Sequence, residues 1–301
     1  MRYLGMRDFL GEIARKYLER KGMVVLPNSS LWYESPIPDF EKLDESFWLK
    51  RSGLAGVNIN EKKALELLEI FENNFKKEYE AFPINETDIP YQYFASNHMF
   101  GPIDAEILYC MIRYFKPSKI IEIGSGYSTR LAAQAILKNQ EVGGSYYCEL
   151  TAIEPYPQIT LKTGFPGFSK LITEPVEKIP LSTFEGLKQN DILFIDSSHV
   201  LRTGGDVQYE YLEILPTLNK GVIIQIHDVR TPEEYPKRRL RQKRFYTEQY
   251  LLQAFLAFNN AFEVLWPGNY MQLNYSNKLD LAFNRHRQFQ GGDSFWMRKV
   301  V

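Results

Sequence analysis

The sequence predicts an α/β fold: a doubly wound, mostly parallel sheet preceded by a mainly helical N-terminal extension. Three observations lead to this prediction. The stretch 119–136 (KIIEIGSGYSTRLAAQAI) reads as a buried strand, a glycine turn and a helix. From Asp104 onward, short apolar runs alternate with helical patterns, which is typical of parallel sheets with crossover helices. Polar residues follow the strands at their carboxyl ends, the edge at which open α/β sheets bind ligands.

The N-terminal part of the chain is expected to form a helical cap. Residues 1–22 place apolar side chains at helical spacing among basic ones. An amphipathic helix packed on its own domain is the simpler interpretation; docking to a membrane surface or a partner is the alternative. A second helix is expected from about Glu61 to Glu80. We therefore predict a helical cap or substrate region over residues 1–90 and a ligand-binding domain over residues 91–301.

The elements after Asp104 follow from apolar periodicity and from turn residues. Asp104 can serve as the N-cap of a helix over residues 105–115. Further helices are expected at 206–218 and 247–258. After the strand of the glycine turn, strands are expected at 148–154, 170–174, 191–196, 221–228, 262–266 and 294–300. The last of these can lie antiparallel at the end of the sheet.

The composition favours an ordinary globular protein of a reducing compartment. Hydrophobic residues make up 44% and charged residues 24% of the chain. The formal net charge of -1 gives no general attraction to nucleic acid, so no nucleic-acid partner is expected. Only two cysteines are present, Cys110 and Cys148, which argues against a disulfide framework. Because no apolar run could span a bilayer and no signal-peptide pattern is seen, we predict no transmembrane segment and a cytoplasmic location.

The glycine turn is the first candidate ligand site. Gly124 and Gly126 lack side chains and so permit close approach of a ligand. The third glycine of a dinucleotide fingerprint is replaced by Thr129, which, like Ser128, can instead cap the helix. Glu122 places a carboxylate near the mouth of the site. That charge would repel a diphosphate but not an ammonium or sulfonium centre.

Two acidic residues end the next strands and are candidates for contacts with a nucleoside. Glu154 can accept hydrogen bonds from both ribose hydroxyls, or it is a solvated turn residue before Pro155. Glu174 is a candidate for the adenine edge. The candidate cofactor-binding residues are Glu122, Gly124, Ser125, Gly126, Ser128, Thr129, Glu154, Glu174 and Asp196.

A second constellation consists of Asp196, His199, His227 and Asp228, which follow two strands expected to be neighbours. Carboxylate oxygens and imidazole nitrogens suit a divalent metal, and histidine also suits general-base catalysis near neutral pH. A hydrogen-bonding role within the SSH turn is the plain structural alternative for His199. These four residues are the candidate catalytic residues.

The run 237–244 (KRRLRQKR) is the strongest local charge in the chain. A solvated basic face without a dedicated ligand is one interpretation. Nucleic-acid binding is disfavoured because no aromatic platform is interleaved with the basic residues. The position of this run after His227 and Asp228 suggests a lid or substrate loop for an anionic acceptor, such as a phosphorylated or uronic sugar.

Several motifs occur in order and together resemble one subgroup of the class I S-adenosylmethionine-dependent methyltransferases. The motifs are EIGSGYST, AIEP, DILFIDSSH, LP-L-KGVIIQIHDV, PEEYP and EQYLLQAFL, spread over residues 90–270. The resemblance implies a Rossmann-like, seven-stranded sheet of the class I methyltransferase type, with S-adenosylmethionine bound by residues 91–301. It also implies that Gly124 and Gly126 approach the methionine and ribose end, that Glu154 binds the ribose, and that Asp196 faces the sulfonium.

Two departures from the pattern concern the fifth strand. The subgroup commonly reads His-x-His-Asp, whereas Gln225 stands at the first position here. Related metal-dependent O-methyltransferases carry acidic or amide ligands where Asp196, His227 and Asp228 stand, which implies a magnesium or manganese site. His227 departs from the usual acidic residue, so metal dependence and a metal-free base both stay open.

The sequence therefore predicts an S-adenosylmethionine-dependent methyltransferase that modifies a hydroxyl of a sugar, polysaccharide or natural product. His227 is the first candidate for the base, with Asp228 or Asp196 orienting it or sharing a metal. A non-catalytic cofactor-binding or assembly protein of the same fold is the alternative. An NAD- or nucleotide-sugar-dependent oxidoreductase is disfavoured by Glu122 and Thr129. The partners expected are a small-molecule or glycan acceptor, anionic or neutral, and a second copy of the chain in a homo-oligomer.

Overall fold

The structure is a computed structural model of the chain and describes residues 2–23, 26, 29–283 and 291–301. It comprises two compact units. The first consists of residues 1–49 and 236–245, and the second of residues 50–235 and 246–301. These units do not divide the chain at residue 90, because residues 50–90 belong to the second unit. The role of residues 1–90 as a cap or substrate region stays a prediction.

The second unit is built on a seven-stranded sheet with the order β3-β2-β1-β4-β5-β7-β6. The strands are β1 (Lys119–Ile123), β2 (Glu149–Ile153), β3 (Lys170–Ile172), β4 (Ile192–Ile195), β5 (Ile223–Ile226), β6 (Phe262–Pro267) and β7 (Phe295–Lys299). Strands β1 to β5 pair in parallel, whereas β7 runs antiparallel to both β5 and β6. The predicted Rossmann-like, mostly parallel α/β fold is confirmed. The connections change direction between β1 and β4, and ligands bind outside the carboxyl ends of strands at such a point.

Each face of the sheet has its own hydrophobic core, because successive residues of a strand point to opposite faces. Ile120 belongs to one core and Ile121 to the other. The first face is covered by α3 (Glu61–Tyr79), α4 (Asp104–Phe115), α5 (Tyr127–Gly143) and α12 (Gly268–Ala282). The second is covered by α7 (Ser182–Glu185), α8 (Asp206–Tyr209), the π-helical η3 (Glu210–Ile214), α9 (Leu215–Thr217) and α11 (Glu248–Leu256). Burial on both faces explains why the strands read as continuous apolar runs.

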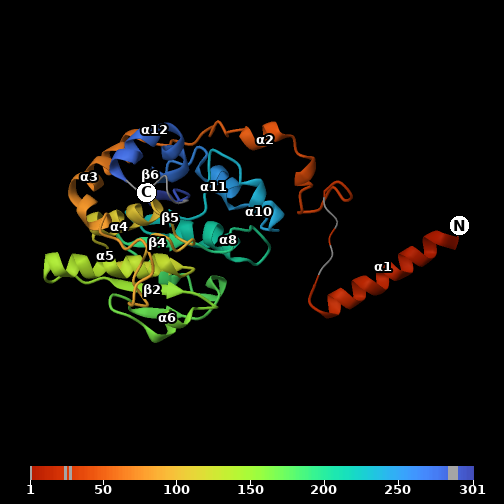
Figure 1. Cartoon of the computed structure of the whole chain (residues 1–301), viewed down its shortest axis with the longest axis horizontal. Helices are drawn as coiled ribbons and strands as arrows, with labels where there is room; N and C mark the ends of the chain where they lie inside the picture. The colour runs from red at the N-terminus through yellow and green to blue at the C-terminus, as the bar shows by residue number, and fades with distance from the viewer. Residues whose placement is uncertain (1, 24–25, 27–28, 284–290) are drawn as a thin grey trace. The chain divides into compact units, whose positions relative to one another are not determined.

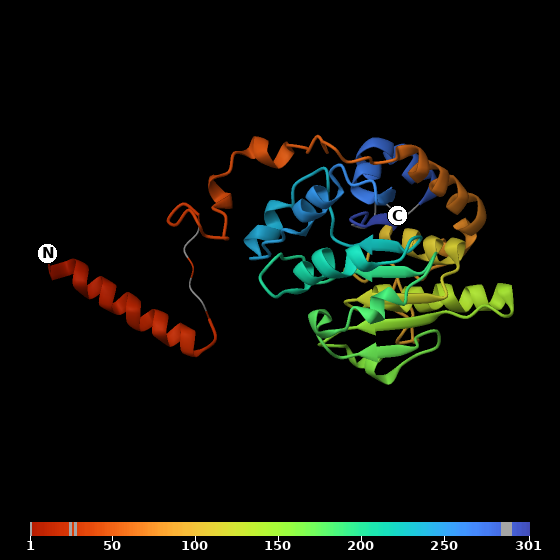
Figure 2. The same cartoon turned by 180° about the vertical axis from the view of Figure 1, so that it is seen from behind.

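The two groups of helices can be followed in the ribbon views. Figure 1 shows α3, α4 and α12 grouped together, with α8 and α11 on another side, and Figure 2 shows the same grouping from behind. Two short elements, α6 (Ile159–Thr163) and η2 (Val176–Lys178), follow β2 and β3. The loops that leave β1, β2, β4 and β5 at their carboxyl ends carry the polar residues that the sequence singled out.

The first unit contains α1 (Arg2–Arg20), η1 (Phe40–Lys42), α2 (Glu45–Leu49) and α10 (Lys237–Arg241). The predicted N-terminal helix is present as α1. Its side chains Ile13 and Tyr17 are 49% and 62% exposed, so residues 11–20 contribute no side chain to a buried core. Within the part of the chain that the structure describes, no helix combines the length and apolar character needed to cross a bilayer.

Candidate active site

A pocket of ≈ 360 Å³ lies where β1, β2 and β4 end, which is the position that the strand order favours for a ligand. Its wall contains residues from four loops: Ile123, Gly124, Ile153, Glu154, Pro155, Tyr156, Pro175, Val176, Glu177, Asp196, Ser197, Ser198, Arg202 and Asp206. Of the predicted cofactor-binding residues, this wall includes Gly124, Glu154 and Asp196.

The two glycines of the turn after β1 have different surroundings. Gly124 has a φ of +81°, and a Cβ placed on it would lie 2.1 Å from the carbonyl oxygen of Asp196. Any larger residue would therefore push β1 and β4 apart. Gly126 has an extended φ of 174°, and nothing lies within 4 Å of the corresponding Cβ position. The space beside Gly126 is thus open to a ligand.

Glu122 lies inside the fold and not at the mouth of the pocket. Its side chain is buried, and the Ser128 hydroxyl donates to its Oε1 at 2.5 Å. Burial raises the pKa of Glu122 to about 8, so the group is mostly neutral at pH 7. The sequence interpretation that this carboxylate repels a diphosphate at the mouth is therefore not supported, because the group is neither charged nor exposed there.

Thr129 and Ser128 are both engaged within the protein. Thr129 is fully buried, and its Oγ1 accepts the backbone N–H of Gly126 at 3.0 Å. Ser128 is also buried and binds Glu122, as described. The turn therefore uses one of its own N–H groups internally, which leaves fewer donors for the oxygens of a phosphate.

Glu154 is held in place at the end of β2 and lines the pocket. Its Oε1 accepts the backbone N–H of Tyr156 at 2.7 Å, and the Ser125 hydroxyl lies 3.5 Å from its Oε2. Glu174, in contrast, has a side chain that is 58% exposed and pairs with Lys178 at 3.8 Å. Its neighbours Pro175 to Glu177 line the pocket, but Glu174 is not among the lining residues.

The charge of the pocket wall is mainly negative. Four carboxylates line it, from Glu154, Glu177, Asp196 and Asp206, against a single guanidinium. That guanidinium, from Arg202, is itself 3.7 Å from Asp206. Burial alone would raise the pKa of Asp196, but the neighbouring imidazoles of His227 and His199 lower it well below its usual value. The pocket therefore suits a ligand with positive charge.

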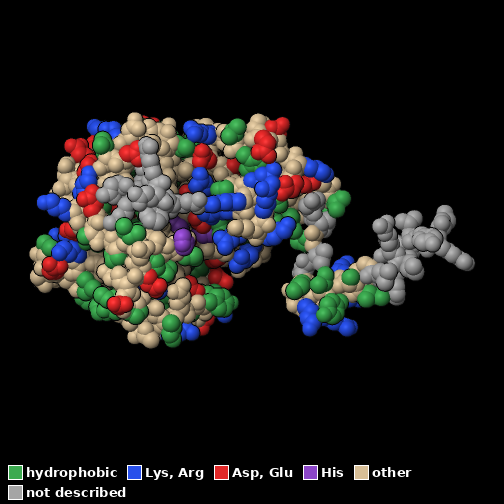
Figure 3. Space-filling view, in the orientation of Figure 1, with side chains coloured by type: hydrophobic (Ala, Val, Ile, Leu, Met, Phe, Trp, Pro, Cys, Tyr) green, Lys and Arg blue, Asp and Glu red, His purple; other side chains and the backbone are tan. Residues whose placement is uncertain are grey.

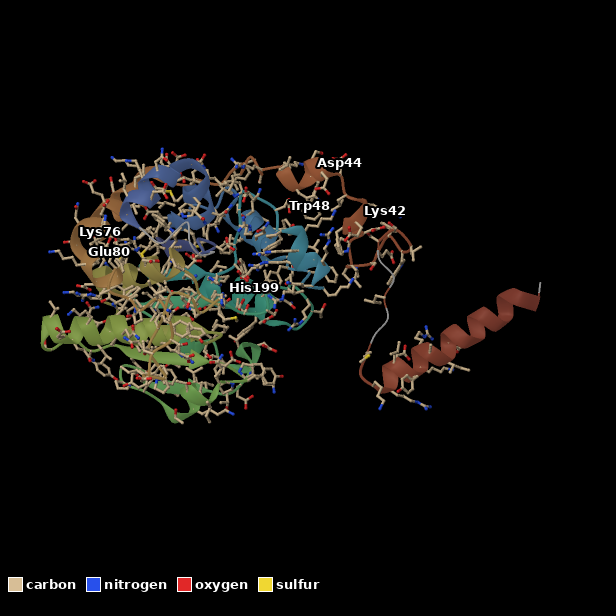
Figure 4. All side chains as sticks on the ribbon, viewed as in Figure 1. Lys42, Asp44, Trp48, Lys76, Glu80 and His199 are labelled. Atoms are coloured by element: carbon tan, nitrogen blue, oxygen red, sulfur yellow. The ribbon has the colours of Figure 1, made fainter. Side chains whose placement is uncertain are left out.

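The four predicted catalytic residues come together in the second unit. Oδ1 of Asp196 lies 3.2 Å from Nε2 of His199 and 3.3 Å from Nδ1 of His227. Asp228 faces the same two ring nitrogens, with Oδ2 3.6 Å from His199 Nε2 and Oδ1 4.0 Å from His227 Nδ1. His199, labelled in Figure 4, lies on the loop after β4, while His227 and Asp228 directly follow β5. Strand pairing of β4 with β5 thus brings the two loops together.

Two buried carboxylates complete this cluster and were not predicted from the sequence. Oε2 of Glu248, at the start of α11, lies 2.8 Å from Nδ1 of His199. Oδ2 of Asp104 lies 3.7 Å from Nε2 of His227. The first letter of the EQYLLQAFL motif could have pointed to Glu248. In the sequence, Asp104 reads only as an N-cap, and nothing there relates it to His227.

That interpretation of Asp104 is wrong, because the helix α4 begins at Asp104 with Ile103 as its N-cap. The Glu106 carboxylate, and not that of Asp104, accepts the backbone N–H of Ile103. The Asp104 carboxylate accepts the backbone N–H groups of Gly292 and Ser294 at 2.7 Å and 2.9 Å. Asp104 therefore joins the start of α4 to the segment before β7, beside His227.

The arrangement favours charged imidazoles. Burial alone would lower the pKa of His199, but hydrogen bonds to Asp196 and Glu248 raise it well above its usual value. Burial alone would likewise lower the pKa of His227, but Asp196, Asp104 and Asp228 together raise it well above its usual value. The carboxylates on either side of each ring therefore favour its imidazolium form.

This cluster does not fit the magnesium or manganese ion that the sequence suggested at Asp196, His227 and Asp228. A histidine can bind a metal only through the lone pair of a neutral ring. Here both ring nitrogens of each histidine face carboxylates. Within the described ranges, no group of three or more His, Cys, Asp or Glu residues has an arrangement that could hold a metal ion.

The basic run lies in the first unit and is partly neutralised there. Lys237 Nζ lies 3.3 Å from Glu45 and 3.6 Å from Glu41, and Arg241 Nε lies 3.1 Å from Glu41. Figure 3 shows lysine and arginine side chains gathered over α10, with acidic side chains beside them. The pairing of Lys237 and Arg241 with acids gives no support to an anionic acceptor at this run.

The part of the chain that forms the pocket is similar to known proteins. Residues 121–229 match a family model described as a methyltransferase domain. An uncharacterized protein of Archaeoglobus fulgidus is 29% identical over 170 residues, which cover 53% of this chain and 73% of that protein.

Solved structures with a similar chain path include two O-methyltransferases. TomG of Streptomyces achromogenes, in complex with S-adenosylmethionine and described as involved in tomaymycin synthesis, is 14% identical; the match covers 78% of this chain and 90% of that chain, with a TM-score of 0.39. The enzyme of Bacillus cereus, in complex with S-adenosylhomocysteine, is 15% identical; the match covers 80% of this chain and 91% of that chain, with a TM-score of 0.38.

The matched segment runs from β1 to the residue after Asp228, and so includes the glycine turn, Glu154 and the two histidines. It coincides with the part of the sheet that forms the pocket. The family match over residues 121–229 and the strand order β3-β2-β1-β4-β5-β7-β6 agree with the predicted resemblance. This part of the chain is similar to the methyltransferase-domain family, as expected for a class I S-adenosylmethionine-dependent methyltransferase.

Proposed function

We propose that the protein transfers a methyl group from S-adenosylmethionine to a hydroxyl oxygen of a sugar, polysaccharide or natural product. The observation that carries this proposal is the proximity of an acidic pocket to a cluster of ionisable groups. Asp196 belongs to both, since it lines the pocket and lies between the imidazoles of His199 and His227. A methyl donor held in the pocket would thus lie beside groups that can take a proton from an acceptor.

The pocket charge supports the choice of cofactor. S-adenosylmethionine carries a sulfonium and an ammonium group, and each would be attracted by a wall of four carboxylates. At an effective dielectric constant of about 20, opposite charges about 4 Å apart attract by roughly 4 kcal/mol. A diphosphate would be repelled by the same wall. We therefore assign the open space beside Gly126 to the cofactor, Glu154 to its ribose, and Asp196 to the side of the sulfonium.

The proposed reaction forms a carbon–oxygen bond to the acceptor and breaks the carbon–sulfur bond of the cofactor, leaving S-adenosylhomocysteine. The hydroxyl proton must leave as the new bond forms. Because carboxylates hold both imidazoles in the protonated form, His227 is not a ready base at neutral pH. We assign the base function to His199 or His227, the two imidazoles that face Asp196. Either ring can accept the proton of the hydroxyl only after it has lost a proton of its own. His227 and His199 are then the catalytic residues, and the carboxylates of Asp196 and Asp228 stabilise the positive charge of the two rings.

The alternative from another class is a cofactor-binding or assembly protein that keeps this pocket without turnover. Calorimetry with S-adenosylhomocysteine and with NAD tests the cofactor first. Binding of NAD without binding of S-adenosylhomocysteine would overturn the proposal. An oxidoreductase acting on NAD or a nucleotide sugar is not favoured by the acidic wall.

The acceptor is tested by a panel of hydroxyl compounds incubated with S-adenosylmethionine. The panel should pair each neutral sugar with its uronic or phosphorylated form and include phenolic natural products, because the charge of the acceptor stays a prediction. The expected result is S-adenosylhomocysteine in equimolar amount with a product one methyl group heavier. Tight S-adenosylhomocysteine binding with no product from any hydroxyl acceptor would favour the assembly alternative.

A further inference from the structure

Glu248 is a fully buried carboxylate outside the pocket wall that contacts one of the two histidines. Its side chain is 1% exposed, and its Oε2 lies 2.8 Å from Nδ1 of His199. This is the shortest distance between a carboxylate and either imidazole of the cluster among the described residues. A charged group with so little access to water is stable only with a close partner. The His199 ring provides that partner.

Backbone hydrogen bonds also connect the start of α11 to the loop that follows β4. Glu248 begins α11, whose N-cap is Thr247. The backbone N–H groups of Thr247 and Glu248 both donate to the carbonyl oxygen of His199, at 2.8 Å and 3.2 Å. The hydroxyl of Thr247 accepts the N–H of Leu201 at 2.8 Å. The first turn of α11 is thus capped by the loop after β4, and it fixes that loop in return.

The His199 ring is held on three sides. Nδ1 faces Glu248, while Nε2 faces Asp196 at 3.2 Å and Asp228 at 3.6 Å. The ring of Tyr246 lies against the imidazole, with the ring centroids 4.7 Å apart. His199 itself has a left-handed φ of +61°, a conformation that a residue other than glycine keeps only when its surroundings impose it.

We propose that Glu248 is the positioning residue of the active site: it holds the proton on Nδ1 of His199 and so leaves Nε2, which faces Asp196 of the pocket wall, as the nitrogen that exchanges a proton. The inference rests on the proposed methyl transfer. A carboxylate that orients an imidazole from the side opposite the substrate is a general device of acid–base catalysis. Glu248 acts through His199 because it does not line the pocket.

Glu210 provides a matched control within the same core. It is fully buried like Glu248, and one oxygen of each has no hydrogen-bond partner. Its Oε2 accepts a hydrogen bond from the Ser197 hydroxyl at 3.1 Å and not from His199. Burial and the charge of Glu248 raise the pKa of Glu210 well above its usual value. Replacement of Glu210 by glutamine therefore tests the loss of a buried carboxyl group in this region without removing the partner of Nδ1.

The test is an NMR experiment on full-length protein labelled with ¹⁵N in its histidines, of which the sequence has four. In the wild type, we expect a slowly exchanging downfield proton bonded to Nδ1 of His199, assigned by its loss in His199→Gln. Glu248→Leu should remove this signal. Glu248→Gln, which keeps an acceptor oxygen, should retain it with an upfield shift, and Glu210→Gln should leave it unchanged. Persistence of the signal in Glu248→Leu, or its equal loss in Glu210→Gln, would overturn the assignment.

Binding and turnover separate positioning from a merely structural role. S-adenosylhomocysteine affinity, measured by calorimetry, should change less than about threefold in Glu248→Gln and Glu248→Leu, because Glu248 lies outside the pocket wall. With the acceptor found in the panel, kcat should fall by about 10²-fold or more in Glu248→Leu, while KM for S-adenosylmethionine stays within about threefold. An unchanged kcat would refute the positioning role. Failure of the wild type to bind S-adenosylhomocysteine would refute the proposed function but not the contact seen by NMR. If Glu248→Leu does not fold, the upfield shift and reduced kcat of Glu248→Gln decide the matter.

Discussion

The backbone of Asp196 occupies the space that a side chain at Gly124 would need. A Cβ on Gly124 would lie 2.1 Å from the Asp196 carbonyl oxygen, and the φ of +81° disfavours any other residue. We expect Gly124→Ala to lower the free energy of unfolding by at least about 2 kcal/mol, from strain and steric overlap. Thermal unfolding measures this effect. A variant with the melting temperature of the wild type would show that β1 and β4 are not so closely packed here.

Gly126→Ala is the matched substitution in the same turn. Its φ of 174° lies outside the left-handed region that favours glycine, and nothing beyond its neighbours in the chain lies within 4 Å of the added Cβ. We expect nearly wild-type unfolding but weaker binding of S-adenosylhomocysteine in calorimetry, since the new methyl group occupies space assigned to the cofactor. Unchanged affinity would mean that the ligand does not pass beside Gly126.

Glu154 and Glu174 distinguish a pocket carboxylate from a surface one. Glu154→Ala should weaken S-adenosylhomocysteine binding by about 1–3 kcal/mol, because it removes a charged acceptor already oriented by Tyr156. Glu174→Ala should have no effect, since its exposed side chain pairs only with Lys178 among the contacts seen. Calorimetry on the two variants side by side measures the difference. Equal losses of affinity would contradict the assignment of the ribose to Glu154.

Glu122→Gln should reveal the buried carboxyl group through the pH dependence of stability. Burial raises its pKa from 4.5 to about 8, so the folded state keeps its proton where the unfolded state loses it. The stabilising contribution of this group is complete below pH 4.5 and is lost as the pH rises towards 8, by at most about 1.4 kcal/mol per pH unit. The glutamine variant lacks this loss. Its melting temperature relative to the wild type should therefore be higher at pH 8 than at pH 4.5, and a constant difference would contradict a neutral Glu122.

The pH profile of methyl transfer tests the charge on the two imidazoles. The pKa values of both His199 and His227 are raised above 6.5, so their stabilising effect is present below pH 6.5 and is lost as the pH rises through the raised values. A base is available only above those values. The rate should hence increase with pH above 6.5, and His199→Gln or His227→Gln should lower it and flatten the profile. The exposed His98 is the control, and His98→Gln should leave the profile unchanged. An inflection below pH 6.5 in the wild type would contradict imidazolium at neutral pH.

Chelation tests the absence of a metal role. Because both ring nitrogens of each histidine face carboxylates, we expect turnover to survive extensive treatment with EDTA. Added magnesium or manganese should not increase it. Loss of activity on chelation, restored by either ion, would show that the cluster rearranges around a metal.

The sequence by itself determined the parts of this protein that depend on local pattern. Apolar runs with β-branched residues predict the strands, and Gly124 marks the turn after β1, because strand formation and positive φ depend on the residues in place. Since parallel strands end at one edge, the sequence also predicted that Asp196, His199, His227 and Asp228 would lie near one another. The structure brings these four residues together.

Only the tertiary structure decided the charge state of the site. Glu122 reads as an exposed carboxylate in the sequence, but packing under α5 buries it and keeps it neutral. In the sequence, Asp104 reads as an N-cap and Glu248 as part of a helix, yet each lies beside an imidazole from a distant part of the chain. Ionisation depends on desolvation and on the partners that the fold supplies, and neither is present in a local pattern of residue types.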